Sequence, residues 1–291
     1  MANRRELVKR RKAAKNIRKI TRTMQLIATA RFQAAFNRAV ATRPYSEKLG
    51  ELVGDLSRAA GGAEHPLMQT NPGVERSALV ILTSNRGLCG GFNANVLRAA
   101  IEHLDSRPEG HEVDVHMVGK KGVSYFRFLK REMTDQTIDL DENVRFDQVE
   151  PIGQSLIDRF VAGEISSASV AYMRFHTTSR QTPEVLQLLP LAPEVPEGEG
   201  SGSTSAVEYE FSPEPEALLD DLLPASVRMR LFQCFTDAVV SEQVARMVAM
   251  KAATDAAGDM ITNLTRQYNR ARQTHITMEL LDIIGGAAAI S

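Results

Sequence analysis

The feature that most constrains the fold is the length of the helical pattern at both ends of the chain. Residues 224 to 291 are expected to form one very long helix, because apolar residues recur along it in steps of three or four. The recurring positions are Ala245, Ala249, Ala252, Ala256, Met260, Leu264 and Tyr268. Helices average about 11–12 residues, so a helix of this length must pack on another element of similar length.

Residues 4 to 42 form the second such stretch and contain no Gly or Pro. Its predicted apolar stripe consists of Ile17, Ile20, Met24 and Ile27, continued by Ala28, Phe32, Ala35 and Ala39. Pro44 is expected to kink this helix without ending it, since the pattern resumes and stops only at Gly61 and Gly62.

Neither stripe can be buried by its own helix. We therefore predict that the two helices pack on each other as an antiparallel coiled coil, with the middle of the chain folded elsewhere. An ordinary two-helix scaffold remains open at this point, because periodicity alone does not show that the two stripes face one another.

The middle of the chain has the pattern of an α/β domain. The near-continuous apolar run at residues 77–83 predicts a strand covered on both faces. Further strands are predicted at 113–118, 168–175 and 185–191, and helices at 93–104, from 119 onward, and at 154–162. Asn93 is expected to cap the first of these helices. This alternation favours a small, mostly parallel sheet.

The segment 192–206 is acidic and rich in Gly and Ser, and we expect a mobile loop there. A last strand at 207–211 and a short helix starting at Ser212 are predicted to follow. The predicted fold is thus a long α-hairpin with an inserted Rossmann-like α/β domain. Its parts are the N-terminal helix (1–60), the α/β domain (76–212) and the C-terminal helix (213–291).

The charge of the chain is strongly polarised. The formal net charge is −1, yet Glu6 is the single acid between Arg4 and Arg43. A basic helix of this kind can bind phosphate backbones, anionic lipid or an acidic protein surface, although a solvated face is the commoner case. No stretch reaches the ~18 apolar residues that a membrane crossing needs, so any role at a membrane would depend on partners.

The sequence offers no convincing catalytic, cofactor or metal site. Gly87, Gly90 and Gly91 follow a predicted strand, where a doubly wound sheet binds phosphate, but their spacing matches neither nucleotide-binding motif. A structural turn is the favoured interpretation. The six histidines show no metal-ligand spacing, and Cys89 and Cys234 are expected to be buried as small apolar groups.

Four blocks resemble the gamma-subunit family of F-type ATP synthases. KNIRKITRTMQLIATARF (15–32) matches the N-terminal block, with Arg31 where Lys is usual. TSNRGLCGGFN (83–93) matches the central block, with Asn85 where Asp is usual, and QTPEVLQLLPL (181–191) matches a strand. The C-terminal match covers SEQVARMVAMKAATDAAGDMI (241–261) and YNRARQTHITMELLDIIGGAAA (268–289). The blocks are colinear and cover nearly the whole chain.

The resemblance implies a rotor shaft that carries no catalytic site and no cofactor. The coiled coil would turn inside a ring of alternating alpha and beta subunits, and the α/β domain would form a foot with the epsilon subunit on the membrane c ring. The complex would lie peripherally on the cytoplasmic face of a bacterial inner membrane. Family positions that contact the beta subunits fall on Met24, Arg246, Gln273, Thr277 and Glu279, and Tyr209 would lie near the c ring.

Two rival functions remain at this stage. A nucleic-acid-binding coiled coil would use the basic helix and would show strong salt-dependent DNA binding. A small nucleotide-binding enzyme would use the Gly87 loop and would bind ATP or NAD as an isolated chain. The rotor interpretation predicts neither property, and it predicts copurification with large ATPase subunits.

Overall fold

The computed structural model describes residues 4–59, 65–108, 110–140, 143–191 and 215–288. The chain divides into two compact units. We call residues 1–30 with 246–291 the helical unit, and residues 31–245 the sheet unit. The predicted strand at 207–211, the helix start at Ser212 and the position of Tyr209 lie outside the described residues.

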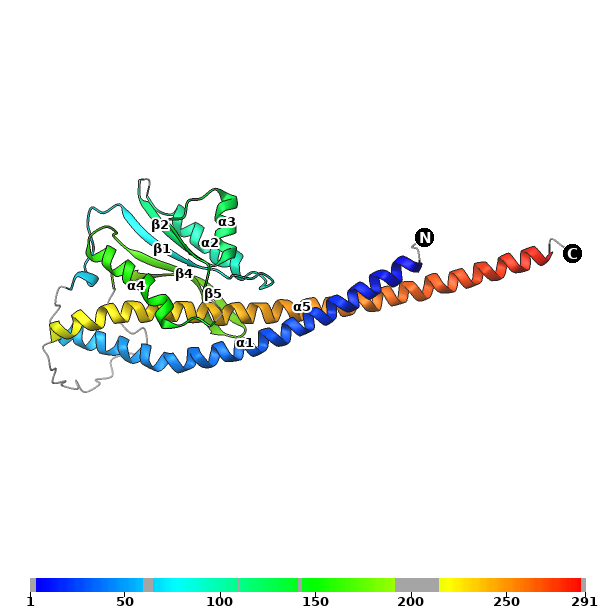
Figure 1. Ribbon diagram of the computed structural model, residues 1–291, viewed down its shortest axis with the longest axis horizontal. Helices are drawn as coiled ribbons and strands as arrows, with labels where there is room; N and C mark the ends of the chain where they lie inside the picture. Colours follow the sequence, from blue (N-terminus) through cyan, green and yellow to red (C-terminus); the bar gives the residue numbers. More distant parts are fainter. Residues whose placement is uncertain (1–3, 60–64, 109, 141–142, 192–214, 289–291) are drawn as a thin grey trace, which may run out of the picture. The chain divides into compact units, whose positions relative to one another are not determined.

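Two long helices begin and end the chain, as predicted (Figure 1). Helix α1 spans Arg4–Ala59 and helix α5 spans Pro215–Ala288. Pro44 lies inside α1 and does not end it. Helix α5 begins earlier than residue 224, and Pro224 lies inside it.

The packed face of α1 repeats every seven residues. Its buried positions include Leu7, Ala14, Thr21 and Ala28 in the helical unit, and Ala35, Leu49 and Leu56 in the sheet unit. A strict seven-residue repeat keeps a seam facing its partner when the helix winds left-handedly.

The predicted isoleucine stripe on α1 was wrong. Ile17, Ile20 and Ile27 are each about half exposed, at 52%, 59% and 48%, whereas Thr21 and Ala28 are buried. Ala28, Ala35 and Ala39 of the predicted stripe are buried, so only its isoleucine part was misplaced. In the helical unit the small side chains of Ala14, Thr21 and Ala28 lie on the packed face of α1, and the larger isoleucines lie on its flank.

In the helical unit, α5 packs antiparallel on α1. Its buried or half-buried positions alternate in steps of four and three. The positions that follow this alternation are Met250, Thr254, Ala257, Ile261, Leu264, Tyr268 and Ala271. Leu264 and Tyr268 were predicted correctly, but Ala252, Ala256 and Met260 are exposed and do not belong to the seam. The predicted coiled coil is confirmed, with its seam shifted around α5.

Polar and aromatic contacts fix the register of this seam. The Thr254 hydroxyl lies 2.8 Å from the Thr21 hydroxyl, in a buried position. The Arg11 guanidinium lies over the Tyr268 ring, 5.1 Å from its centroid. Both pairs join an early residue of α1 to a late residue of α5, as an antiparallel arrangement requires.

The sheet unit holds a five-stranded sheet in the order β3-β2-β1-β4-β5. The strands are β1 (Arg76–Leu82), β2 (Glu112–Val118), β3 (Asp135–Thr137), β4 (Ala168–Thr177) and β5 (Arg180–Leu189). The β1–β2, β1–β4 and β2–β3 pairs are parallel, and β5 runs antiparallel to β4. Every residue of β1 after Arg76 is buried, as a central strand requires. Strand β3 was not predicted, because three polar residues give no strand pattern.

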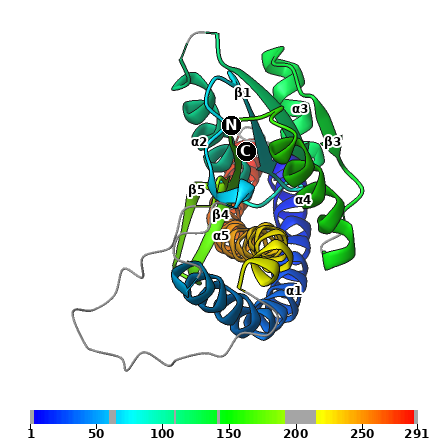
Figure 2. The same ribbon diagram turned by 90° about the vertical axis from the view of Figure 1, so that its left-hand side faces the viewer.

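Helices cover both faces of this sheet. They are α2 (Phe92–Asp105), α3 (Lys120–Leu129) and α4 (Phe146–Val161), with a short 3-10 turn at Pro66–Met68. Figures 1 and 2 show α2 and α3 on the side of the sheet away from the first half of α5. Helix α4 packs on α5, where the Phe146 and Phe232 rings meet edge to face at 5.7 Å. The α5 residues Leu219 to Ala238 thereby join the main core.

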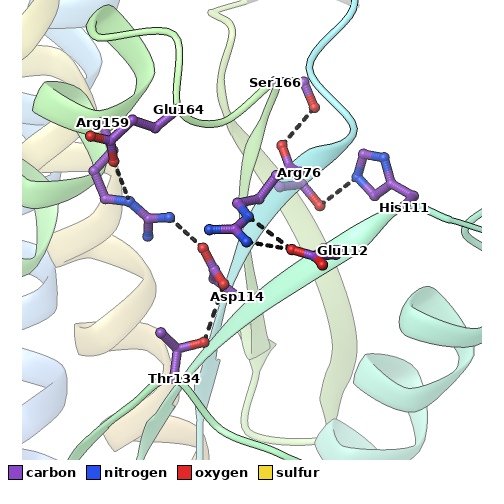
Figure 3. Close-up of polar contacts among 9 residues, drawn as sticks. Arg76, His111, Glu112, Asp114, Thr134, Arg159, Glu164 and Ser166 are labelled. Carbon is purple, nitrogen blue, oxygen red and sulfur yellow. Dashed lines mark hydrogen bonds and ion pairs between the residues drawn. The ribbon is translucent and has the colours of Figure 1, made fainter.

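Salt bridges hold the amino-terminal ends of β1 and β2 (Figure 3). Arg159 of α4 donates to Asp114 of β2, which also accepts from the Thr134 hydroxyl at 3.3 Å. Arg76 of β1 pairs with Glu112 of β2 at a more exposed position. These contacts tie α4 to the sheet at the end opposite the glycine-rich loop.

Candidate functional site

The glycine-rich loop after β1 is a rigid turn held by its own side chains. Asn93 accepts from the Ser84 amide at 2.9 Å, donates to the Ser84 hydroxyl at 2.8 Å and lies 3.3 Å from the buried Cys89 sulfur. Helix α2 therefore begins with Gly91 at its N-cap, without a side-chain cap. The predicted capping role of Asn93 was wrong, because its amide is used inside the loop.

Asn85 joins this loop to two other segments. Its Nδ2 donates to the Leu140 carbonyl at 2.7 Å, and its Oδ1 accepts from the Lys120 amide at 3.0 Å. An ionised Asp could accept but not donate, so Asn85 makes a contact that the residue usual in the family could not make. The prediction of a structural turn agrees with this geometry.

The first amides of α3 are also satisfied by β1 and the loop. Besides Lys120, the Lys121 amide donates to the Ser84 carbonyl at 3.1 Å, and the Gly122 amide donates to the Thr83 hydroxyl at 3.0 Å. Gly119 has a φ of 94°, and a Cβ there would lie 2.1 Å from the Thr83 carbonyl oxygen. This turn is closed by protein groups and offers no phosphate cradle of the P-loop kind.

The second candidate region is the exposed surface of the helical unit. From Arg272 to Gly285 every residue of α5 is exposed. This segment carries several large apolar side chains: Ile276, Met278, Leu280, Leu281, Ile283 and Ile284. Exposed apolar surface of this extent marks a surface that a partner covers.

A basic groove lies in the same unit. Four cations, Lys15, Arg18, Lys19 and Arg22, line it together with Thr254, Asp255 and Ile261. Its volume is about 620 Å³. Asp255 is its single acid, so the groove favours an acidic surface.

Within the ranges that the structure describes, no three His, Cys, Asp or Glu side chains are grouped as a metal would need. Burial lowers the pKa of His116 although Asp135 is nearby. Across the same ranges, none of the helices has both the length and the apolar character that a membrane crossing demands.

Comparison with known proteins decides the family. The family model of ATP synthase matches residues 3–290. The ATP synthase gamma chain of Rhodopirellula baltica is 44% identical over 295 residues, covering 100% of this chain and 99% of its own length. That of Leptospira biflexa is 40% identical over 294 residues, with full coverage of both chains. The chain belongs to the ATP synthase gamma chain family.

Solved structures support the fold of this gamma chain. A chain of the Euglena gracilis mitochondrial ATP synthase, from an OSCP/F1/c-ring structure, has a TM-score of 0.70 at 21% identity and covers 99% of this chain. A rotor chain of the same enzyme has a TM-score of 0.64 at 19% identity and covers 94%. The combination of helical hairpin and sheet domain is therefore shared with known stalk chains.

The positions that the family resemblance predicts as beta-subunit contacts lie in different environments. Gln273, Thr277 and Glu279 are exposed on α5, and the Thr277 hydroxyl donates to the Gln273 carbonyl at 3.0 Å. Glu279 lies 3.4 Å from His275. Met24 is half-buried on α1, and Arg246 is only 7% exposed.

Sequence reasoning missed the polar pair inside the seam and the apolar flank outside it. Thr21 and Thr254 were not singled out, although each occupies a heptad position of its helix. Ile17, Ile20 and Ile27 were assigned to the seam and lie outside it. The seven-residue spacing from Leu7 onward was the signal that could have found the true face.

Proposed function

We infer that this gamma chain is the central rotor shaft of a proton-translocating F-type ATP synthase. It couples rotation of the membrane c ring to conformational changes in the catalytic beta subunits during ATP synthesis or hydrolysis. The chain performs no chemistry itself. Each angle of the shaft stabilises a different conformation of each beta subunit, because the contact free energies differ.

The exposed end of α5 is the observation that carries this function. Between Arg272 and Gly285 the apolar side chains point outward without a covering element in the described chain. Exposed apolar side chains at this density need an apolar sleeve that covers them. A ring of alpha and beta subunits would supply one.

We assign the shaft to the two terminal segments, residues 1–60 and 213–291. We assign the foot, which would contact the epsilon subunit and the c ring, to residues 76–212. The Euglena structures, which combine F1 and a c ring, support this assignment of partners. The chain is part of a peripheral membrane-associated complex, which we place on the cytoplasmic face of a bacterial inner membrane because its relatives are bacterial.

The contact residues of the shaft form two groups. Gln273, Thr277 and Glu279 are exposed polar groups that would grip the beta subunits below the apolar tip. Arg246 would belong to the same group of polar hooks. Met24 would act on the shank, farther from the tip, and the basic groove beside Arg18 would meet acidic segments of beta. Tyr209 would lie near the c ring.

Replacing Ile283 with Ser tests the sleeve. Ile283 is 70% exposed, so the substitution should change the free energy of unfolding of the isolated chain by no more than about 0.5 kcal/mol. Association with alpha and beta subunits should weaken by roughly tenfold, because the apolar contact is lost. Binding is measured by titrating the chain into the alpha–beta complex.

Val161→Ser is the matched control, since Val161 is 56% exposed on α4 in the sheet unit. It should change neither stability nor association with the head. Equal association of the Ile283→Ser chain and the wild type would exclude a close sleeve around the tip.

Replacing Met24 with Lys tests the shank. The new cation would lie where the shaft meets the beta subunits, so we expect weaker coupling between proton flow and ATP synthesis with the fold retained. Coupling is measured as the ratio of proton pumping to ATP hydrolysis in membrane vesicles. The control is Thr178→Lys, which adds the same charge in the exposed turn between β4 and β5. An unchanged ratio of pumping to hydrolysis for Met24→Lys would show that Met24 does not contact the beta subunits.

A further inference from the structure

The sheet unit contains a cavity that the rotor function does not use. It lies at the carboxyl ends of β1 and β2, beside Thr83 and Gly119, and has a volume of about 330 Å³. Open parallel sheets bind their ligands outside the carboxyl ends of the strands. The volume is at the lower end of the range for small-molecule pockets, about 300–1,000 Å³.

The cavity wall combines cations with amides. Arg31 of α1 and Arg86 of the glycine-rich loop face it together with a single carboxylate, Glu242 of α5. The Asn85 amide is held by Leu140 and Lys120, so this part of the wall is rigid. Two guanidinium groups against one carboxylate give the cavity a net positive charge. Guanidinium forks bind carboxylate and phosphate groups in a bidentate manner.

Most of the remaining wall is apolar, with Thr83 and Asn143 as its polar residues. Phe92 and Phe235 line the cavity from opposite helices, and each is only 3% exposed. Leu82, Val118 and Ala238 complete this surface. A ligand that fills the cavity must therefore carry an apolar body as well as its charge.

We propose that this cavity binds a small organic oxyanion, a carboxylate or phosphate ester attached to a compact apolar group. The volume is too small for a dinucleotide, and the glycine-rich loop lacks the lysine and spacing that a pyrophosphate needs. A single oxyanion would pair with Arg86 and Arg31, and its apolar body would contact Phe92 and Phe235.

Binding at this cavity would stabilise the sheet unit. The ligand would contact α1, α5, the loop and two strands, and it binds the folded chain only. A ligand of this kind raises the thermal midpoint by mass action. The effect is independent of rotation, so it can be measured on the isolated full chain.

The test uses four probes on the full chain: phenyl phosphate, benzoate, benzyl alcohol and inorganic phosphate. With one or both organic anions we expect saturable binding in calorimetry and a raised thermal midpoint. The comparison of phenyl phosphate with benzoate shows whether the site prefers a phosphate or a carboxylate. Benzyl alcohol lacks the charge and should not bind. Inorganic phosphate lacks the apolar body and should bind about tenfold more weakly or worse.

Two variants locate the site. Arg86→Gln removes a charge-assisted hydrogen bond from an exposed loop residue and should weaken binding about tenfold or more. Arg98→Gln makes the same charge change on the exposed face of α2 and should leave binding unchanged. Ala238→Leu would fill the cavity, and its fold is checked by circular dichroism.

The proposal is overturned if neither organic anion binds saturably at millimolar concentration. It is also overturned if the Arg86→Gln chain binds as tightly as the wild type, or if a folded Ala238→Leu chain keeps full affinity. Equal affinity for inorganic phosphate and phenyl phosphate would show that the apolar wall does not contribute to binding, which contradicts the proposal.

Discussion

At the scale of single residues, the least expected side chain is Asp237, a buried carboxyl group on α5. Burial raises its pKa to about 6, against the opposing effects of a hydrogen bond from Gln233 and the charges of Arg43 and Arg174. The Gln233 amide donates to it at 3.0 Å. The folded chain therefore favours the neutral form more than the unfolded chain does.

This raised pKa predicts the direction of a stability change. Because the folded pKa lies above the unfolded value, Asp237 costs stability above pH 6, and that cost is relieved as the pH falls from 6 toward 4. Asp237→Asn removes the titration and keeps an acceptor for Gln233. The variant's free energy of unfolding should exceed that of the wild type by a larger margin at pH 7.5 than at pH 5, and the margin should grow by about 1 kcal/mol or more. Urea denaturation at both pH values measures this, and a pH-independent difference would show that Asp237 titrates normally.

At the scale of elements, the link between α4 and β2 depends on a partly buried ion pair. The Asp114 and Arg159 side chains are 17% and 27% exposed, whereas those of Arg76 and Glu112 are 48% and 67% exposed. Asp114→Asn should lower the free energy of unfolding by about 1–3 kcal/mol, since Arg159 loses its less exposed carboxylate and keeps only the contact with Glu164 at 3.4 Å. Glu112→Gln, the matched exposed change, should cost at most about 0.5 kcal/mol. Equal costs in chemical denaturation would mean that burial does not distinguish the two pairs.

The same scale shows what sequence could and could not predict. The central strand was predicted from its apolar run, and both long helices from their uninterrupted pattern. The seam was misassigned because Ile17 and Ile20 are more hydrophobic than Thr21, while close packing of two backbones selects for small size. Asn93 was misassigned because the partner of its side chain, Ser84, becomes visible only when the loop folds back.

The candidate site, too, could be predicted from the sequence only in part. The unmatched glycine spacing correctly indicated a structural turn. The cavity beside it could not be predicted, because its wall comes from Arg31, Arg86 and Glu242, which are far apart in sequence. Contact positions on the shaft came from family resemblance and not from local pattern.

At the scale of the whole molecule, we expect α1 and α5 of the helical unit to turn together as one body. Thr21 and Thr254 lie in contact across their seam, so cysteines at both positions should form a disulfide without displacing either helix. The chain's own thiols, Cys89 and Cys234, are both buried. They should not compete for this bond.

The most direct test is single-molecule rotation of a probe on the sheet unit, with the Thr21→Cys, Thr254→Cys chain assembled in a surface-held alpha–beta head. We predict unidirectional, ATP-driven rotation at the same rate before and after oxidation. A disulfide between two helices that already move together should not alter the rotation rate. Rotation that stops on oxidation and returns on reduction would contradict it, since the helices would then have to slide past each other. A probe that never rotates would contradict the rotor function itself.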